Sequence, residues 1–112
     1  QGQPAFRQAL MSAYRNVCAV SGCSVRDVLQ AAHVVAVKDK GDHGVSNGIL
    51  LRADLHNLFD RGLMYFDQTG RVRFADVVKD DEYTRYEGKR CALVLQNVEK
   101  RALELHRKKH KR

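Results

Sequence analysis

A chain of 112 residues with 44% apolar residues can build one domain around a single modest core. Its 20 Lys and Arg against 13 Asp and Glu leave a net charge of +7, which favours a polyanionic partner such as DNA or RNA. No apolar run approaches the roughly 18–20 residues that span a bilayer, and no signal-peptide pattern opens the sequence, so we expect no membrane partner.

The first part of the sequence predicts a helix, an extended piece, a strand and a loop. Apolar residues at helical spacing, with Pro4 in the first turn, predict a helix that extends to Asn16. Residues 17–23 have the pattern of a short extended piece, and the Val-rich stretch 28–37 predicts a buried strand. Residues 38–46 hold two glycines among charged side chains, which favours a surface loop.

The middle of the sequence predicts a second strand and a helix. Asn47-Gly48 favours a tight turn, and a short strand is expected over residues 49–51. Residues 53–61 suit a helix that ends at Gly62, because glycine readily adopts the left-handed conformation after a last helical turn. The order is therefore strand, loop, strand, helix.

The last part predicts a hairpin, one more strand and a final helix. Residues 63–67 and 71–75 flank Gln68-Thr69-Gly70, which is typical of a hairpin. After a polar, irregular segment, residues 90–95 are expected to form a strand. A helix is predicted from Asn97, as its cap, to the end of the chain.

Three spaced residues carry the clearest functional signal: His33, Asn47 and His56, which are fourteen and nine residues apart. His33 follows two alanines, Asn47 precedes a glycine, and His56 opens the run His-Asn-Leu-Phe-Asp-Arg-Gly. In this order and spacing the sequence resembles the HNH endonuclease family in its "AAH…NG…LH-x-x-F-D-x-G" form, which occurs in many bacterial restriction-type endonucleases.

The resemblance implies an α+β fold. A ββα-metal core at about residues 28–62 would carry an added amino-terminal helix, β-hairpin and carboxyl-terminal helix, all within a single domain of residues 1–112. Because the chain begins at Gln1 and not at Met, we expect it to be excised from a longer protein that has a separate recognition domain.

The resemblance also implies a function, the metal-dependent hydrolysis of DNA phosphodiester bonds, with RNA not excluded as a substrate. It favours the cleavage domain of a modification-dependent restriction enzyme, and cleavage of both strands by a single-site domain would favour a homodimer. Two alternatives stay open: a non-catalytic nucleic-acid-binding module on the same scaffold, and an antibacterial toxin nuclease.

The family places its general base at His33, and a histidine with a pKa near neutrality can take a proton from water. The alternative for His33 is a buried structural histidine. Asn47 is interpreted as a positioning residue whose side-chain amide bridges backbone groups and holds His33 in register. The alternative for Asn47 is an ordinary turn asparagine, and the two roles are compatible.

His56 and Asp60 lie one helical turn apart on one face, and the resemblance implies a metal ligand at His56 and, as in some members, a second one at Asp60. The alternative for Asp60 is a carboxylate at the helix end in a surface salt bridge. Many HNH enzymes carry Asp or His immediately before the base, where this chain has Ala32. His43 is therefore a further candidate for substrate contact or ligation, or else a solvated loop residue. Asp54, the other carboxylate nearby, is expected to cap the helix.

One histidine and one carboxylate, completed by water and phosphate oxygens, suit Mg²⁺ or Mn²⁺, whereas Zn²⁺ would need one more nitrogen ligand. Cys18 and Cys23 have no second Cys pair, and Cys91 is remote in sequence, so we expect inert thiols and no structural zinc. Three cysteines without a disulfide pattern fit a reducing compartment, the bacterial cytoplasm.

Four arginines close to the motif are expected to contact DNA, and the basic carboxyl-terminal run is either a further phosphate contact or a solvated end. The arginines are Arg52, Arg61, Arg71 and Arg73.

Overall fold

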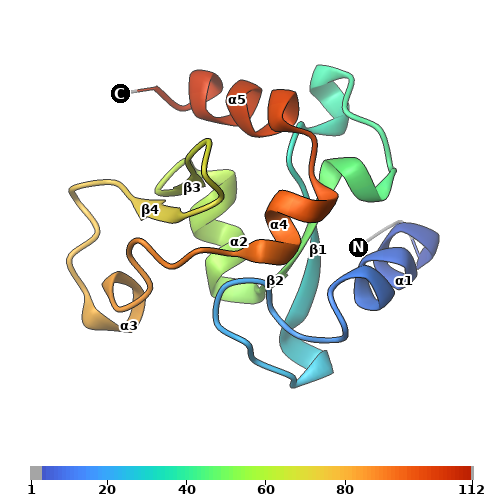
Figure 1. Cartoon of the computed structure of the whole chain (residues 1–112), viewed down its shortest axis with the longest axis horizontal. Helices are drawn as coiled ribbons and strands as arrows, with labels where there is room; N and C mark the ends of the chain where they lie inside the picture. The colour runs from blue at the N-terminus through green and yellow to red at the C-terminus, as the bar shows by residue number, and fades with distance from the viewer. Residues whose placement is uncertain (1–3, 112) are drawn as a thin grey trace.

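The computed structural model describes residues 4–111, and in it two small antiparallel sheets combine with five α-helices (Figure 1). This arrangement confirms the predicted α+β class. The helices are α1 (Pro4–Ala13), α2 (Ala53–Asp60), α3 (Asp81–Thr84), α4 (Ala92–Asn97) and α5 (Lys100–Lys109). The strands are β1 (Leu29–His33), β2 (Gly48–Arg52), β3 (Met64–Phe66) and β4 (Val72–Phe74).

The ββα unit forms as the sequence predicts. Strand β1 pairs antiparallel with β2, with Leu29 opposite Arg52 and His33 opposite Gly48, and α2 follows β2 directly. Strand β1 ends at His33, earlier than the predicted residue 37, because Asn47 N donates to Gly44 O within the loop and Val35 N donates to the Asn47 side chain, so the ladder does not continue. The loop that follows contains two short 3₁₀ turns, η2 (Val37–Asp39) and η3 (Val45–Asn47).

Helix α1 covers the β1–β2 hairpin on one side. Its buried side chains Phe6 and Leu10 reach Gly48, where an added Cβ would lie 2.8 Å from each of them. Beyond the last turn of α1, the buried Tyr14 hydroxyl donates to Gly48 O at 2.9 Å. The start of β2 is therefore held by close packing and by a satisfied buried hydrogen bond.

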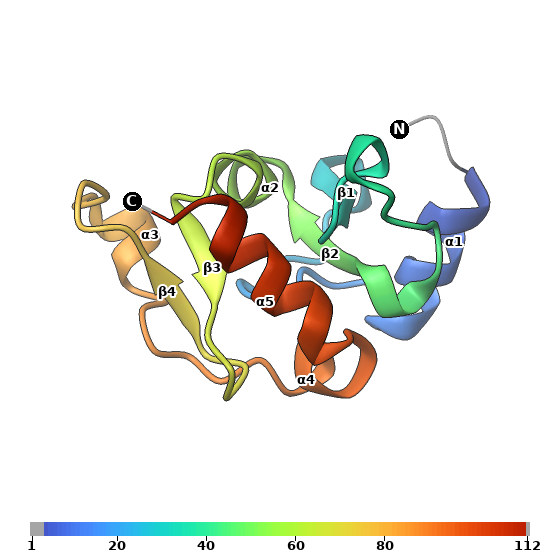
Figure 2. The same ribbon diagram turned by 90° about the horizontal axis from the view of Figure 1, so that it is seen from above.

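The second sheet pairs β3 with β4, which confirms the predicted hairpin, and α5 crosses between the two sheets (Figure 2). Gly62 and Gly70 adopt φ values of +70° and +78°, as expected at the end of α2 and in the hairpin turn. Helix α5 buries Ala102, Leu103 and His106 in this space. No helix within residues 4–111 has the length and hydropathy needed to cross a membrane.

Three predictions about local structure are wrong. Residues 17–23 form a tight turn, because Gly22 N donates to Cys18 O and Cys18 N donates to Cys23 O. Residues 90–95 make only one bridge to the hairpin, at Arg90, before the chain turns into α4. The final helix begins at Lys100 after Glu99, whereas Asn97 ends α4.

Candidate active site

A cleft of about 580 Å³ lies between the end of β1, helix α2 and the last turns of α5. Four of the five histidines of the chain line it, and the fifth, His43, contacts one of those four. The cleft therefore joins residues of the predicted motif to residues more than forty positions away in the sequence. Its lining consists of Ala31, His33, Val34, Ala36, Val37, Lys38, His56, Asp60, His106, Lys109 and His110.

His33 is held on two sides at the end of β1. Its ring stacks on Phe6 of α1 with centroids 4.1 Å apart and planes 12° apart. Its Nε2 lies 2.9 Å from Nδ1 of His43. Burial, followed by the neighbouring His43, lowers the pKa of His33, so its neutral form is favoured near neutral pH. A neutral imidazole at the wall of a cleft has the protonation state that a general base requires.

Asn47 closes the loop that follows His33. Its side chain is only 5% exposed, and its Oδ1 accepts a hydrogen bond from Val35 N at 2.8 Å. Its Nδ2 donates to Val35 O and to Asp42 O, both at 2.9 Å. Gly41 permits this approach, because a Cβ at that position would lie 1.8 Å from Val35 O. The amide of Asn47 therefore fixes the backbone two residues beyond His33.

His56 and Asp60 project from α2 into the same cleft, with His56 Nε2 3.1 Å from Asp60 Oδ2. On its other side, His56 Nδ1 donates to Gln30 Oε1 at 2.7 Å, which leaves Nε2 directed towards the carboxylate. Two ligands at right angles on one cation, with bonds of about 2.1 Å, stand about 3 Å apart, so the pair suits a shared divalent ion.

Within the described residues, the pair has no third potential protein ligand grouped with it. Within residues 4–111 no three His, Cys, Asp or Glu side chains group closely enough to form a complete metal site. Ala32 is fully buried and faces away from the cleft lining, so the position before the base offers no ligand. Water and phosphate oxygens would have to fill the remaining positions, which is the usual pattern for Mg²⁺.

The carboxyl-terminal helix forms the opposite wall of the cleft. His106 is buried, stacks on Phe59 with centroids 3.8 Å apart, and donates from Nε2 to Phe59 O at 2.7 Å. Burial lowers the pKa of His106 to about 4, although this hydrogen bond acts in the opposite direction. Lys109 forms an ion pair of 2.7 Å with Asp39 and thereby joins α5 to η2.

The four arginines expected at the DNA lie outside the lining of the cleft. The guanidinium of Arg52 pairs with Asp54 at 2.7 Å, and that of Arg73 pairs with Asp67 at 2.9 Å. Arg71 donates to Gly88 O at 2.9 Å. Arg61, which follows α2, also lies outside the lining. Among the residues that the structure describes, the lysines of the cleft are instead Lys38 and Lys109.

Asp54 does not cap α2 as expected, because it is the second residue of the helix and the N-cap position is occupied by Arg52. Its carboxylate accepts hydrogen bonds from Arg52, from the Tyr83 hydroxyl at 3.1 Å and from Leu55 N at 3.0 Å. Asp54 therefore ties the β2–α2 junction to the α3 region. It is not part of the cleft lining.

Cys18 has a structural role in the turn before β1. Its buried sulfur accepts hydrogen bonds from Ser21 N and from Arg52 N, both at 3.3 Å. The three cysteines are free thiols. The sulfur thus links this turn to the end of β2.

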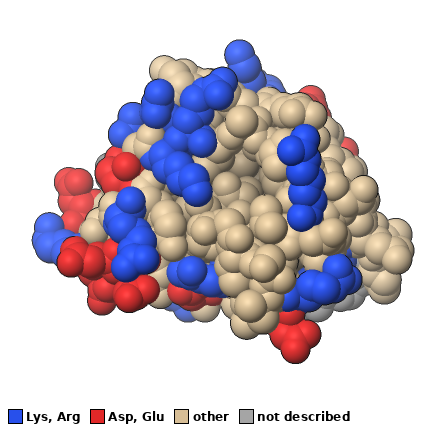
Figure 3. Space-filling model, turned by 60° about the horizontal axis from the view of Figure 1, so that its bottom comes forward, with Lys and Arg blue, Asp and Glu red and all other residues tan. Residues whose placement is uncertain are grey.

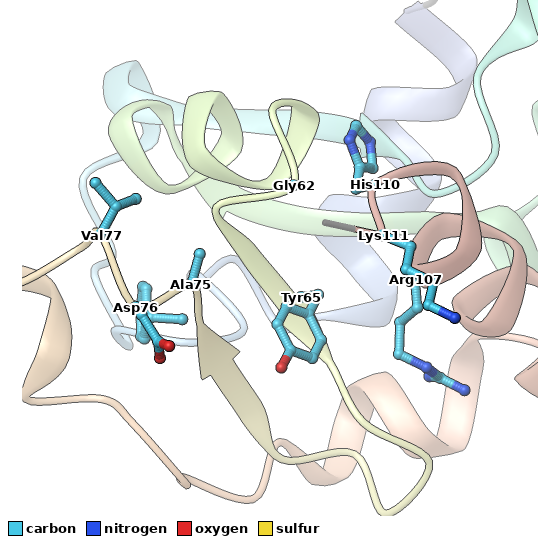
Figure 4. Close-up of a pocket in the computed structure, with 9 residues that line it drawn as sticks. Gly62, Tyr65, Ala75, Asp76, Val77, Arg107, His110 and Lys111 are labelled. Carbon is cyan, nitrogen blue, oxygen red and sulfur yellow. The ribbon is translucent and has the colours of Figure 1, made fainter.

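A second hollow of about 540 Å³ adjoins the cleft, and His110 lines both (Figure 4). Tyr65 of the hairpin lies on one side of it, and Arg107 and Lys111 lie on the other. On the face shown in Figure 3, most acidic side chains gather on the side of α3, which holds Asp81 and Glu82 in its first turn.

Sequence reasoning missed Phe6, Gln30, His106 and His110. A usable signal existed for the last two, because His106 and His110 are four residues apart on one predicted helix, the same spacing as His56 and Asp60. No signal existed for Phe6 or Gln30, since their partners depend on how α1 and α2 pack on the strands.

We predict that Asn47→Ala lowers the free energy of unfolding by about 2 kcal/mol or more, because the buried N–H and C=O groups of Val35 lose their partner. Urea unfolding measures this loss. Asn57→Ala is the matched control, since Asn57 is exposed on α2. Equal losses in the two variants would contradict the role of Asn47 in closing the loop.

Stability should also depend on the protonation of His106. The unfolded chain binds a proton on this residue near pH 6.5 and the folded chain only near pH 4, so its contribution is complete above pH 6.5 and is lost as the pH falls towards 4. Between pH 7 and pH 5 the loss is about 2 kcal/mol. Urea unfolding at both pH values should show a smaller loss for His106→Gln than for the wild type; identical losses would refute the assignment.

Comparison with known proteins agrees with this geometry. Residues 18–67 match the family model described as HNH endonuclease, and this range contains the whole ββα unit with His33, Asn47, His56 and Asp60. No curated protein sequence matches the chain. The ββα segment, in which His33 at the end of β1 and His56 of α2 line one cleft, is similar to the HNH endonuclease family.

Proposed function

We propose that this chain is a metal-dependent endonuclease domain that hydrolyses DNA phosphodiester bonds. The observation that carries the proposal is the meeting of three groups at one cleft: a histidine favoured in its neutral form, and a histidine–carboxylate pair 3.1 Å apart. The first can take a proton from water, and the second can hold a divalent cation. The basic character of the chain suits a polyanionic substrate.

In the proposed reaction His33 takes a proton from the attacking water as that water adds to phosphorus, and the 3′ oxygen leaves. The products carry a 5′ phosphate and a 3′ hydroxyl. His56 and Asp60 would hold a divalent cation, Mg²⁺ or Mn²⁺ by the character of these ligands, and this ion would supply charge stabilisation to the phosphate and the leaving oxygen. Gln30 orients the ring of His56, and Asn47 together with Phe6 holds His33 at the cleft.

The scissile strand is proposed to lie along the cleft, where Lys38 stands on one wall and Lys109 on the other. The strand continues past His110 into the second hollow, where Arg107 and Lys111 add positive charge. Arg52 and Arg73 contribute less than the sequence suggests, because their guanidinium groups pair with carboxylates. Contacts of lysine to phosphate give affinity that depends on salt and not on base sequence.

The biological setting is proposed from the family alone. The domain would act as the cleavage part of a modification-dependent restriction enzyme in a bacterial cytoplasm, beside a separate recognition domain and with a homodimer for double-strand cleavage. A non-catalytic nucleic-acid-binding module is the second candidate. The observation that favours it is the small set of potential ligands, since Ala32 supplies none and, among the described residues, no third ligand groups with His56 and Asp60.

Plasmid nicking with Mg²⁺ or Mn²⁺ tests the enzyme. Wild-type protein should cut, and His33→Ala should cut roughly 10²–10⁴ times more slowly through loss of the base. Asp60→Asn should weaken Mn²⁺ binding measured by titration calorimetry, whereas Asp27→Asn, which alters an exposed carboxylate outside the cleft, should leave it unchanged. DNA binding without cleavage, unaffected by a chelator, would instead support the non-catalytic module.

Binding of DNA to His33→Ala protein tests the proposed path of the strand. Adding Lys38→Ala or Lys111→Ala should reduce the slope of log affinity against log salt by about 1 each, because each lysine releases one counterion. Lys79→Ala, which removes a lysine that lines neither hollow, should leave the slope unchanged. Equal slopes for all these variants would place the DNA elsewhere.

A further inference from the structure

We infer that His43 is a positioning residue that selects the reactive tautomer of His33. This inference deepens the proposed function and rests on it, because it concerns the histidine assigned there as the base. His43 does not line the cleft, so it contacts neither the cation nor the scissile phosphate. It acts instead through the 2.9 Å hydrogen bond between its Nδ1 and His33 Nε2.

A single hydrogen lies between these two nitrogens, and its position decides whether His33 can act as a base. If His33 Nε2–H donates to His43 Nδ1, the lone pair of neutral His33 stands on its Nδ1. If His43 donates instead, the lone pair of His33 on Nε2 is already used, and its Nδ1 carries a hydrogen. Among the described residues no hydrogen bond reaches His33 Nδ1, so this atom stays available for water. Only the first arrangement leaves it basic.

The backbone of His43 is fixed on both sides. Asn47 Nδ2 donates to Asp42 O, and Gly44 N donates to the Asp42 carboxylate at 2.9 Å. The ring of His43 meets the ring of His33 edge-on, at 5.0 Å and 70°, and also lies edge-on to Phe6. The loop thus places Nδ1 of His43 2.9 Å from Nε2 of His33, while Phe6 covers one face of the base.

Asn47 also links the loop to the base, because its side chain bonds to the backbone on both sides of the loop. By holding Asp42 O, Asn47 fixes the residue next to His43, and by holding Val35 it fixes the strand end that carries His33. Both partners of the histidine–histidine hydrogen bond are anchored to one buried amide. A single side chain thus sets the position of the donor and of the acceptor.

Long-range ¹H–¹⁵N spectra of metal-free protein at about pH 8 read the tautomer directly, because a bare ring nitrogen and one that bears hydrogen have different shifts. Wild-type His33 should carry its hydrogen on Nε2. His43→Asn should keep that tautomer, since asparagine Oδ1 is a hydrogen-bond acceptor at about the same distance from the backbone as Nδ1 of histidine. His43→Ala should mix both tautomers and lower kcat about tenfold or more with little change in KM, while His43→Asn should retain most of the activity.

The inference is overturned if wild-type His33 carries its hydrogen on Nδ1, or if His43→Ala leaves the Nε2–H tautomer unmixed. It is also overturned if His43→Asn and His43→Ala lose equal activity, because the acceptor would then not be what matters. Because His43 is exposed, thermal unfolding of both variants should match the wild type. A wild-type chain with the expected tautomer that never cuts DNA would overturn the proposed function itself, which separates the two failures.

Discussion

The buried amide of Asn47 is the contact on which the arrangement of the site depends. The chain leaves β1 at His33 and returns to β2 at Gly48 through a loop whose central residues 38–44 are charged residues, histidine and glycine. Three hydrogen bonds of the Asn47 side chain close this loop: its Oδ1 accepts one and its Nδ2 donates two, so both polar atoms of the amide have partners. Because the Asn47 side chain is buried and its three hydrogen bonds are partly shielded from water, they are stronger than surface contacts, and they fix the position of the base and its neighbours.

The cleft is an assembly of two distant parts of the chain. One side, with His33, His56 and Asp60, comes from β1 and α2 of the ββα unit, and the other side comes from α5. Helix α5 is held there by the stack of His106 on Phe59 and by the hydrogen bond to Phe59 O, at the last turn of the helix that carries the proposed metal ligands. The neutral, buried His106 is thus part of the framework, whereas the less buried His33 has the protonation state of a reactive group.

The sequence predicts correctly those parts of the fold that depend on short-range patterns. The ββα unit, its hairpin and the grouping of His33 with His56 and Asp60 follow from short-range spacing, because a helix places residues i and i+4 together and an antiparallel pair has a definite register. The arginines were misjudged because nearness in sequence does not reveal ion pairs such as that of Arg73 with Asp67. The strand expected at residues 90–95 was wrong because apolar composition alone cannot show that a strand lacks a neighbour.

The exposed ion pair between Lys109 and Asp39 links α5 to η2 at one edge of the cleft. On the proposed path of the strand, a phosphate between η2 and α5 would compete with Asp39 for the ammonium group of Lys109, so binding of the substrate would exchange one anion for another. The protein thereby keeps a solvent-exposed cation in place without burying it, and the carboxylate that it displaces is left free in water at low energetic cost. An ion pair of this kind would be broken by the phosphate charge of any nucleic acid strand, whatever its base sequence.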